Sequence, residues 1–208
     1  MGAGGAAALI GTPLVLVGGL VVGLLFFGST GEAGACVPQD GPAADCLALP
    51  LDPGFQMTDD YGPRDEPVRG SGSWHPAVDL QNWPDPCGKP VYAITGGEVI
   101  EKAGFRLSIR SADGYVVSYL HMELGDILVS LHDTVAPGQR IGAVGNAGPS
   151  TGCHLDLRIK VTAGAEGPIA ALPRSQTVGG PDDYVSPEDF YAALGSALCP
   201  PETCRRAY

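Results

Sequence analysis

The sequence predicts a mostly β domain built around an antiparallel sheet. With 31 glycines and 19 prolines among 208 residues, the composition favours turns and short strands over long helices. Asp113-Gly114 separates two β-rich runs, which is a strong hairpin signal. The segment Cys153–Val161 alternates with period two, so Leu155, Leu157 and Ile159 face one side and His154, Asp156 and Arg158 the other.

Further strands and one helix extend this interpretation along the chain. We expect strands over Pro90–Ile94 and Gly97–Ala103, and a turn followed by a strand within residues 134–145. Ser186-Pro187 is typical of a helix start, because serine caps the first turn and proline fits its first position. The domain therefore ends in a short C-terminal helix.

The N-terminal segment Ala8–Phe27 carries no charge and has about the 20 residues that a transmembrane helix needs. Ala33-Gly34-Ala35 resembles a signal-peptidase site, but the segment lacks a basic start and exceeds the usual apolar core. We favour an uncleaved membrane anchor over a cleaved signal. The predicted organisation is an anchor or signal over 1–30, a linker over 31–52, the main domain over 53–195 and a cysteine-containing tail over 196–208.

Charge and cysteine content limit the partners and the compartment. The net charge is −11 and no Lys or Arg precedes Arg64, which argues against nucleic-acid binding. An even number of six cysteines beside an export signal predicts disulfides in an oxidising compartment. Cys36/Cys46 and Cys199/Cys204 would close short loops and Cys87/Cys153 would be a long-range link, although six cysteines allow about 15 pairings.

Three of the four histidines stand in patterns suited to metal chemistry. His75 and Asp79 lie four residues apart, and an imidazole with a carboxylate suits zinc and related ions. His154 and Asp156 share one face of a strand, whereas His121 ends the strand after the hairpin. Each pattern is also compatible with ordinary surface residues. His132 is predicted to be a surface residue.

The order and spacing of these motifs resemble the M23 metallopeptidases, the LytM or lysostaphin-type peptidoglycan endopeptidases. The resemblance extends from about Asp59 to Tyr191 and implies a LytM-like antiparallel β fold (a duplicated hybrid motif) with its site in a groove. The matching segments are DDYGPR (Asp59–Arg64), WHPAVDL (Trp74–Leu80), PCGKPVYAITGGEVIEKAG (Pro86–Gly104), YVVSYLHM (Tyr115–Met122), VAPGQRIGAVGNAGPSTGCHLDLRI (Val135–Ile159) and YVSPEDFY (Tyr184–Tyr191).

The resemblance implies one zinc ion held by His75, Asp79 and Asp156, with His154 and His121 as catalytic residues that act on the attacking water and the oxyanion. It also implies that a Cys87–Cys153 disulfide would brace the site. Three positions depart from the family pattern. Asp156 stands in place of the third ligand histidine, Ala77 in place of glycine and Arg158 in place of glutamate. The aspartate makes the site harder and more anionic.

Three functional hypotheses follow. The first is an extracytoplasmic, zinc-dependent endopeptidase that hydrolyses the peptide cross-links of peptidoglycan, either membrane-anchored or secreted. The alternative is a catalytically degenerate domain of the same fold that binds cell wall or a partner enzyme without hydrolysis, as Asp156 suggests. A third is a structural module that the anchor displays among other cell-envelope proteins.

Overall fold

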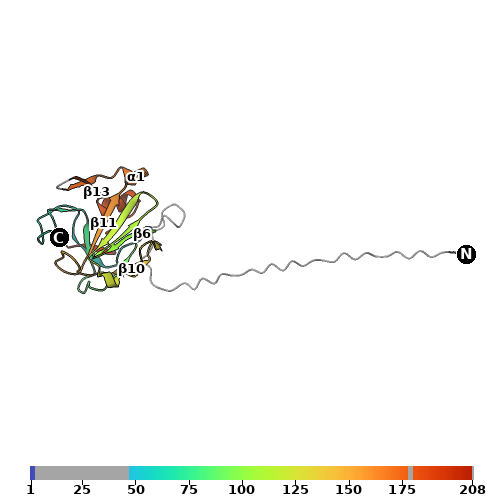
Figure 1. The fold of residues 1–208 in the computed structure, drawn as a ribbon, viewed down its shortest axis with the longest axis horizontal. Coiled ribbons are helices and arrows are strands. Elements are labelled where there is room, and N and C mark those ends of the chain that lie inside the picture. The colour runs from blue at the N-terminus through green and yellow to red at the C-terminus, as the bar shows by residue number, and fades with distance from the viewer. Residues whose placement is uncertain (3–46, 178–179, 208) are drawn as a thin grey trace. The chain divides into compact units, whose positions relative to one another are not determined.

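The computed structural model describes residues 1–2, 47–177 and 180–207, and it shows a mostly β domain with antiparallel sheets and few helices (Figure 1). The predicted anchor Ala8–Phe27 and the Cys36/Cys46 pair lie outside the described residues. Within the described part, no helix has the length and apolarity needed to cross a membrane.

The elements follow one another from Phe55 to Arg206. They are β1 (Phe55–Asp59), β2 (Gly62–Pro63), β3 (Trp74–His75), β4 (Val78–Gln81), β5 (Pro90–Tyr92), β6 (Gly97–Ala103), β7 (Arg106–Arg110), β8 (Tyr115–Leu120), η2 (Leu124–Asp126), β9 (Thr134–Val135), β10 (Arg140–Ala143), β11 (Leu155–Val161), α1 (Gly167–Ala170), β12 (Arg174–Thr177), β13 (Gly180–Val185), α2 (Pro187–Ala193) and β14 (Cys204–Arg206).

The main sheet has the strand order β14-β1-β4-β11-β8-β7-β6-β9, and β13 also pairs with β11 and β12. Only the β14–β1 pair is parallel; the other pairs described in this sheet are antiparallel. Strand β11 lies between β4 and β8 (Figure 1). It therefore joins segments that are far apart in the sequence.

The predicted strands and the hairpin are confirmed, but β5 ends at Tyr92 and β11 begins at Leu155, so His154 lies just before its strand. Strands β7 and β8 pair in antiparallel register on either side of Asp113-Gly114. Gly114 has a φ of 84°, and a Cβ atom there would lie 2.4 Å from the backbone nitrogen of Ala165, so the turn needs glycine. In the predicted C-terminal helix, α2, the Ser186 side chain accepts a hydrogen bond from the Asp189 backbone N–H.

Alternation in β11 separates the core from the site. Leu155, Leu157 and Ile159 are fully buried in the hydrophobic core, whereas Arg158 is only half-buried on the other face. Apolar burial of this kind is the main favourable contribution to folding. The strand is thus anchored by one face and presents its polar residues on the opposite face.

Segments at both ends of the described region also contribute to the core. Leu47 and Leu51, inside the predicted linker, are buried, and the Tyr191 hydroxyl donates a 2.6 Å hydrogen bond to the carbonyl of Ala48. In the predicted tail, Leu198 is buried and β14 pairs with β1. The first segment therefore contacts α2, and the tail extends the main sheet beside β1.

Two disulfides are present among the described cysteines, Cys87–Cys153 and Cys199–Cys204. The first joins residues 66 positions apart and ends immediately before His154. The second joins residues only five positions apart and closes the turn that precedes β14. The long-range pairing confirms the link implied by the resemblance, and it braces the start of β11.

We expect a Cys87→Ser/Cys153→Ser double variant to lose about 4 kcal/mol of unfolding free energy, because loop-closure entropy grows with the length of the closed loop. A Cys199→Ser/Cys204→Ser variant should lose only about 2 kcal/mol by the same relation. Chemical denaturation of both variants beside the wild type measures the difference. Equal losses would contradict the assignment of the long-range disulfide as the main covalent brace.

Candidate functional site

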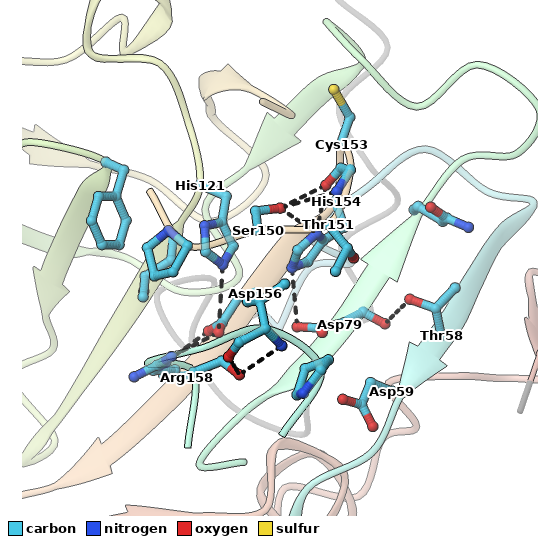
Figure 2. Close-up of a pocket in the computed structure, with 18 of the residues that line it drawn as sticks. Thr58, Asp59, Asp79, His121, Ser150, Thr151, Cys153, His154, Asp156 and Arg158 are labelled. Carbon is cyan, nitrogen blue, oxygen red and sulfur yellow. Dashed lines mark hydrogen bonds and ion pairs between the residues drawn. The ribbon is translucent and has the colours of Figure 1, made fainter. Parts of the chain in front are cut away.

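A pocket of about 600 Å³ opens over β1, β4 and β11 and is lined by four of the five predicted site residues (Figure 2). Its lining includes Asp79, His121, His154 and Asp156, and His75 lies beside Asp79 and Asp156. The structure therefore brings together all five residues selected from the sequence. Three of them lie in strands β3, β4 and β11, whereas His121 follows β8 and His154 precedes β11. They are separated by up to about 80 positions in the chain.

Three carboxylates lie side by side across neighbouring strands. The register places Asp59 of β1 opposite Asp79 of β4, and Asp79 opposite Asp156 of β11. Like charges directly opposite one another destabilise a sheet. The negative charge of Asp156 is especially unfavourable without a cation nearby, because only 3% of its side chain is exposed. The row of carboxylates, defined here as Asp59, Asp79 and Asp156, therefore requires positive charge close by.

Three imidazoles are oriented in the same way toward these carboxylates. The Nδ1 atom of His75 lies 2.9 Å from the carbonyl of Asp60, that of His121 lies 2.7 Å from Ala147, and that of His154 lies 2.8 Å from Gly152. A carbonyl only accepts hydrogen bonds, so each Nδ1 carries the proton. All three Nε2 atoms are consequently left for the site.

Backbone geometry directs His121 into the pocket. His121 follows β8 with a φ of 68°, a conformation that is uncommon for residues other than glycine and that ends the strand sharply. Its ring stacks on Phe105 at 5.6 Å and lies 4.6 Å from the ring of His154. Gly145 permits the backbone at His121 to approach closely, because a Cβ at residue 145 would lie 2.5 Å from the His121 carbonyl oxygen.

The atoms around His75 fit a divalent metal ion. Its Nε2 lies 3.2 Å from Oδ1 of Asp79 and 3.6 Å from Oδ2 of Asp156. Ligand atoms at about 2.0–2.2 Å from a tetrahedral zinc ion would be separated by about 3.3–3.6 Å. Both His75 Nε2 and Asp79 Oδ1 are buried and lack a hydrogen-bond partner in the described part of the chain. A bound metal would satisfy both atoms.

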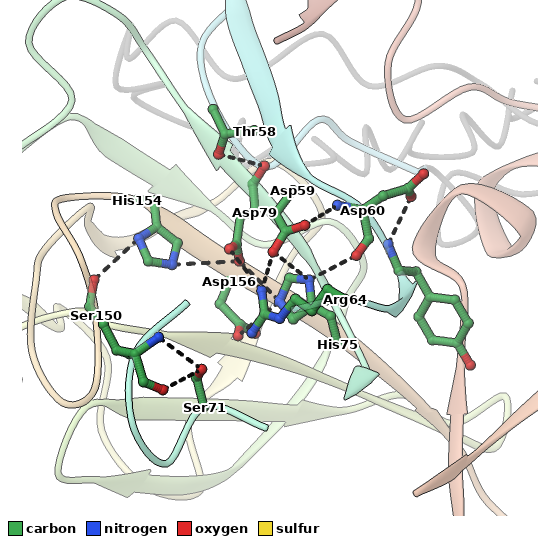
Figure 3. A network of polar contacts seen from close by, with 12 residues as sticks. Thr58, Asp59, Asp60, Arg64, Ser71, His75, Asp79, Ser150, His154 and Asp156 are labelled. Atoms are coloured by element: carbon green, nitrogen blue, oxygen red, sulfur yellow. Dashed lines mark hydrogen bonds and ion pairs between the residues drawn. The ribbon is translucent and has the colours of Figure 1, made fainter. Parts of the chain in front are cut away.

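Asp59 offers an alternative to Asp156 as the third ligand. Ligand atoms of Asp59, His75 and Asp79 lie within 4.8 Å of one another. However, Asp59 Oδ2 is 3.7 Å from His75 Nδ1, the nitrogen that is committed to the Asp60 carbonyl. Asp156 instead faces the free Nε2. The tautomer of His75 therefore favours His75, Asp79 and Asp156 as the ligand set (Figure 3).

Two arginines neutralise the ends of the row of carboxylates. Arg64 forms an ion pair with Asp59, and its Nη1 is also 3.7 Å from Oδ2 of Asp79 (Figure 3). Arg158 donates two charge-assisted hydrogen bonds to Asp156, from Nε to Oδ1 at 2.7 Å and from Nη2 to Oδ2 at 2.8 Å (Figure 2). This forked geometry is the strongest form of arginine–carboxylate pairing.

The carboxylates and the burial move the imidazole pKa values in opposite directions. Burial alone would lower the pKa of His75, but Asp156 and Asp79 outweigh it and raise that pKa to about 9. Burial lowers the pKa of His121, and the neighbouring His154 lowers it further. Burial would raise the carboxyl pKa of Asp156, but the hydrogen bonds from Arg158 and the positive charge of His75 outweigh burial and hold that pKa well below its usual range. His75 is therefore protonated at neutral pH without a metal, whereas His121 is neutral.

The sequence prediction omitted Asp59 and Arg64 from the site. Both lie in the DDYGPR segment, but nothing in their local pattern indicates that they approach Asp79. The cross-strand register, which the sequence does not show, brings them there. His132 lies elsewhere: its side chain is 74% exposed and its Nδ1 is 2.9 Å from Glu98, as expected for a surface residue.

Comparisons with known proteins agree with this geometry. Residues 74–168 match the model of peptidase family M23, and this range contains all five predicted site residues. The chain is 32% identical over 143 residues to the peptidoglycan DD-endopeptidase ShyC of Vibrio cholerae, covering 64% of this chain and 31% of ShyC. It is 34% identical over 118 residues to ShyA of the same organism, covering 54% of this chain and 26% of ShyA.

Among solved structures, a zinc-containing peptidase from Vibrio cholerae is similar, with 32% sequence identity and a TM-score of 0.46. The match covers 54% of this chain and 36% of that one. The chain thus spans about a third or less of the length of the two Vibrio relatives it matches. Residues 74–168, which contain the five converging residues, thus form a domain that matches the model of peptidase family M23.

Proposed function

We propose that this protein is an extracytoplasmic, zinc-dependent endopeptidase that hydrolyses the peptide cross-links of peptidoglycan. The observation that carries the proposal is the convergence of three imidazole Nε2 atoms on the carboxylates of Asp79 and Asp156 in one open pocket. The names of ShyC and ShyA, both peptidoglycan DD-endopeptidases, support the substrate class.

His75, Asp79 and Asp156 would hold the ion, and His75 would be fixed by its Nδ1 hydrogen bond to Asp60. When bound, zinc supplies a Lewis acid that polarises the scissile carbonyl and makes water a better nucleophile at neutral pH. A short hydrogen bond to the Gly152 carbonyl holds His154, whose Nε2 lies 3.5 Å from Asp79 Oδ1. Its ring is thus positioned beside the proposed ligands.

His121 is suited to accept a proton during the reaction. Its lowered pKa keeps the ring neutral, and the Nδ1–H donated to Ala147 leaves a lone pair on Nε2. That Nε2 lies 3.9 Å from Asp156 Oδ2, at the edge of the proposed ligand set. His121 and His154 would therefore orient and deprotonate the attacking water, and the imidazolium formed would return the proton to the leaving amine.

The compartment and the anchor belong to the same proposal. The two disulfides are typical of proteins in an oxidising compartment, which supports an extracytoplasmic location. The apolar segment Ala8–Phe27 would attach the chain to a membrane, or direct its secretion if it is removed. Peptidoglycan lies outside the cytoplasmic membrane, so this location would bring the pocket to its substrate.

The direct test is to incubate the full-length, zinc-loaded protein with purified peptidoglycan and to measure released peptides with and without a chelator. We expect chelator-sensitive release, and a His154→Ala variant should lose about 100-fold or more of the rate while keeping its zinc, because it removes an acid–base group. His132→Ala is the matched control and should keep wild-type activity, since His132 lies on the surface. Absence of release from a protein shown to hold zinc would refute the proposed activity.

Zinc binding should also release protons. Because the pKa of His75 is raised to about 9 in the metal-free protein, a neutral ligand forms at pH 7.5 only when that proton leaves. We expect release of about one proton per zinc ion at pH 7.5, falling toward zero above pH 9. Calorimetry in buffers of different ionisation enthalpy measures this number. Zinc binding without proton release at pH 7.5 would argue against His75 as a ligand.

A second candidate function is a catalytically degenerate domain that binds cell wall or a partner enzyme. The observation that favours it is the Arg158–Asp156 pair, which satisfies this carboxylate without a metal. If the protein is an active endopeptidase, the wild-type chain should bind about one zinc ion. Asp156→His should then change the zinc affinity of the site rather than create zinc binding. If the wild type holds no zinc and Asp156→His gains both metal and hydrolysis, the degenerate reading is correct. Metal analysis and the peptide-release assay give the answer.

A further inference from the structure

The ion pair between Arg158 and Asp156 lies on a single strand of the pocket. Arg158 and Asp156 are two residues apart on β11, so their side chains share one face. Both Asp156 oxygens accept hydrogen bonds from the guanidinium, and the carboxylate is almost completely buried. The negative charge of Asp156 is therefore already compensated by a cation that belongs to the protein itself.

Arg64 and Arg106, two other arginines that line the pocket, contact their acidic neighbours differently. Arg64 pairs with Asp59 at the opposite end of the row of carboxylates and is 3.7 Å from Asp79. Arg106 lies 4.0 Å from Glu101 and touches no member of the row. Arg158 is thus the arginine that holds the carboxylate proposed as the third zinc ligand.

A metal ion and the Arg158 guanidinium would compete for the same carboxylate. The forked pair engages both Asp156 oxygens, including Oδ2, the oxygen that faces His75. If the ion binds Oδ2 while the guanidinium stays in place, the positive charge of Arg158 remains next to the ion. This position is poorly solvated, so the repulsion between the two cations is only weakly screened. If the guanidinium moves away instead, its two charge-assisted hydrogen bonds are lost. Both routes weaken metal binding.

We propose that Arg158 is a built-in counter-ion that competes with zinc for Asp156 and thereby sets the metal affinity of the site. The inference rests on the proposed zinc function and gives a role to a residue with no counterpart in the expected ligand set. Arg158 acts through Asp156, so it is a positioning residue rather than a catalytic one. The chain would bind zinc only where the free zinc concentration is high enough for zinc to compete with Arg158 for Asp156.

The test is a zinc titration of the metal-free, full-length protein by calorimetry at one fixed pH. Arg158→Met keeps much of the side-chain volume but removes the charge, so the buried Asp156 carboxylate would depend on the metal for compensation. We expect its zinc Kd to be at least about tenfold tighter than that of the wild type, whereas Arg158→Lys, which keeps the charge, should stay within about threefold. Arg106→Met is the matched control and should leave Kd unchanged.

Arg158→Gln guards against misfolding of the methionine variant, because its amide can still donate a hydrogen bond to Asp156. We expect tighter zinc binding in this variant as well. An unchanged affinity in whichever of the two variants folds would overturn the inference. A weaker affinity would also overturn it and would show that Arg158 prepares Asp156 for the metal. Absence of zinc binding in every form would overturn it together with the zinc function. Tighter binding by the variants, combined with no peptide release by zinc-loaded wild type, would support the inference and refute only the proposed activity.

Discussion

The row of carboxylates is the constraint on which the rest of the site depends. Asp59, Asp79 and Asp156 face one another across β1, β4 and β11 because the sheet register places them there. Their mutual repulsion opposes the same strand pairing that buries the hydrophobic core on the other face. Such an arrangement persists only if cations occupy the space between and around the carboxylates. The surrounding residues are best understood as the source of that charge.

The protein supplies this charge from three directions. Arg64 neutralises Asp59, Arg158 neutralises Asp156, and His75 becomes protonated between Asp79 and Asp156. A zinc ion would replace the His75 proton, since it would occupy the Nε2 side of the ring. On this proposal, metal binding at the site would be an exchange of cations. The metal affinity would then depend on how firmly the protein's own cations are held, and not only on the number of ligands.

Much of the fold could be predicted because the relevant signals are local. Asp113-Gly114 marks a turn by its own backbone preferences, and the alternation of Leu155, Leu157 and Ile159 fixes which face of β11 enters the core. The resemblance to a known family, based on the order of its motifs, implied that His75 and His154 would lie close together. The compartment and the membrane anchor stay predictions, and residues 8–27 lie outside the described part of the chain.

The missed features depend on contacts between distant segments. Asp59 approaches Asp79 through the β1–β4 register, and Ala48 reaches Tyr191 by a hydrogen bond that spans 143 positions. No local periodicity in the sequence indicates either contact. The alternation of β11 placed Arg158 on the same face as Asp156, and Arg158 also departs from the family pattern. The spacing alone does not specify the two hydrogen bonds that Arg158 donates to Asp156.

The most direct measurement is X-ray anomalous diffraction at the zinc edge from crystals of the zinc-loaded protein. An ion held by the proposed ligands should give one strong peak about 2.0–2.2 Å from His75 Nε2 and from one oxygen each of Asp79 and Asp156. A peak on the Nδ1 side of His75 beside Asp59, or no peak in the pocket of a protein that hydrolyses peptidoglycan, would contradict the assignment of the metal centre.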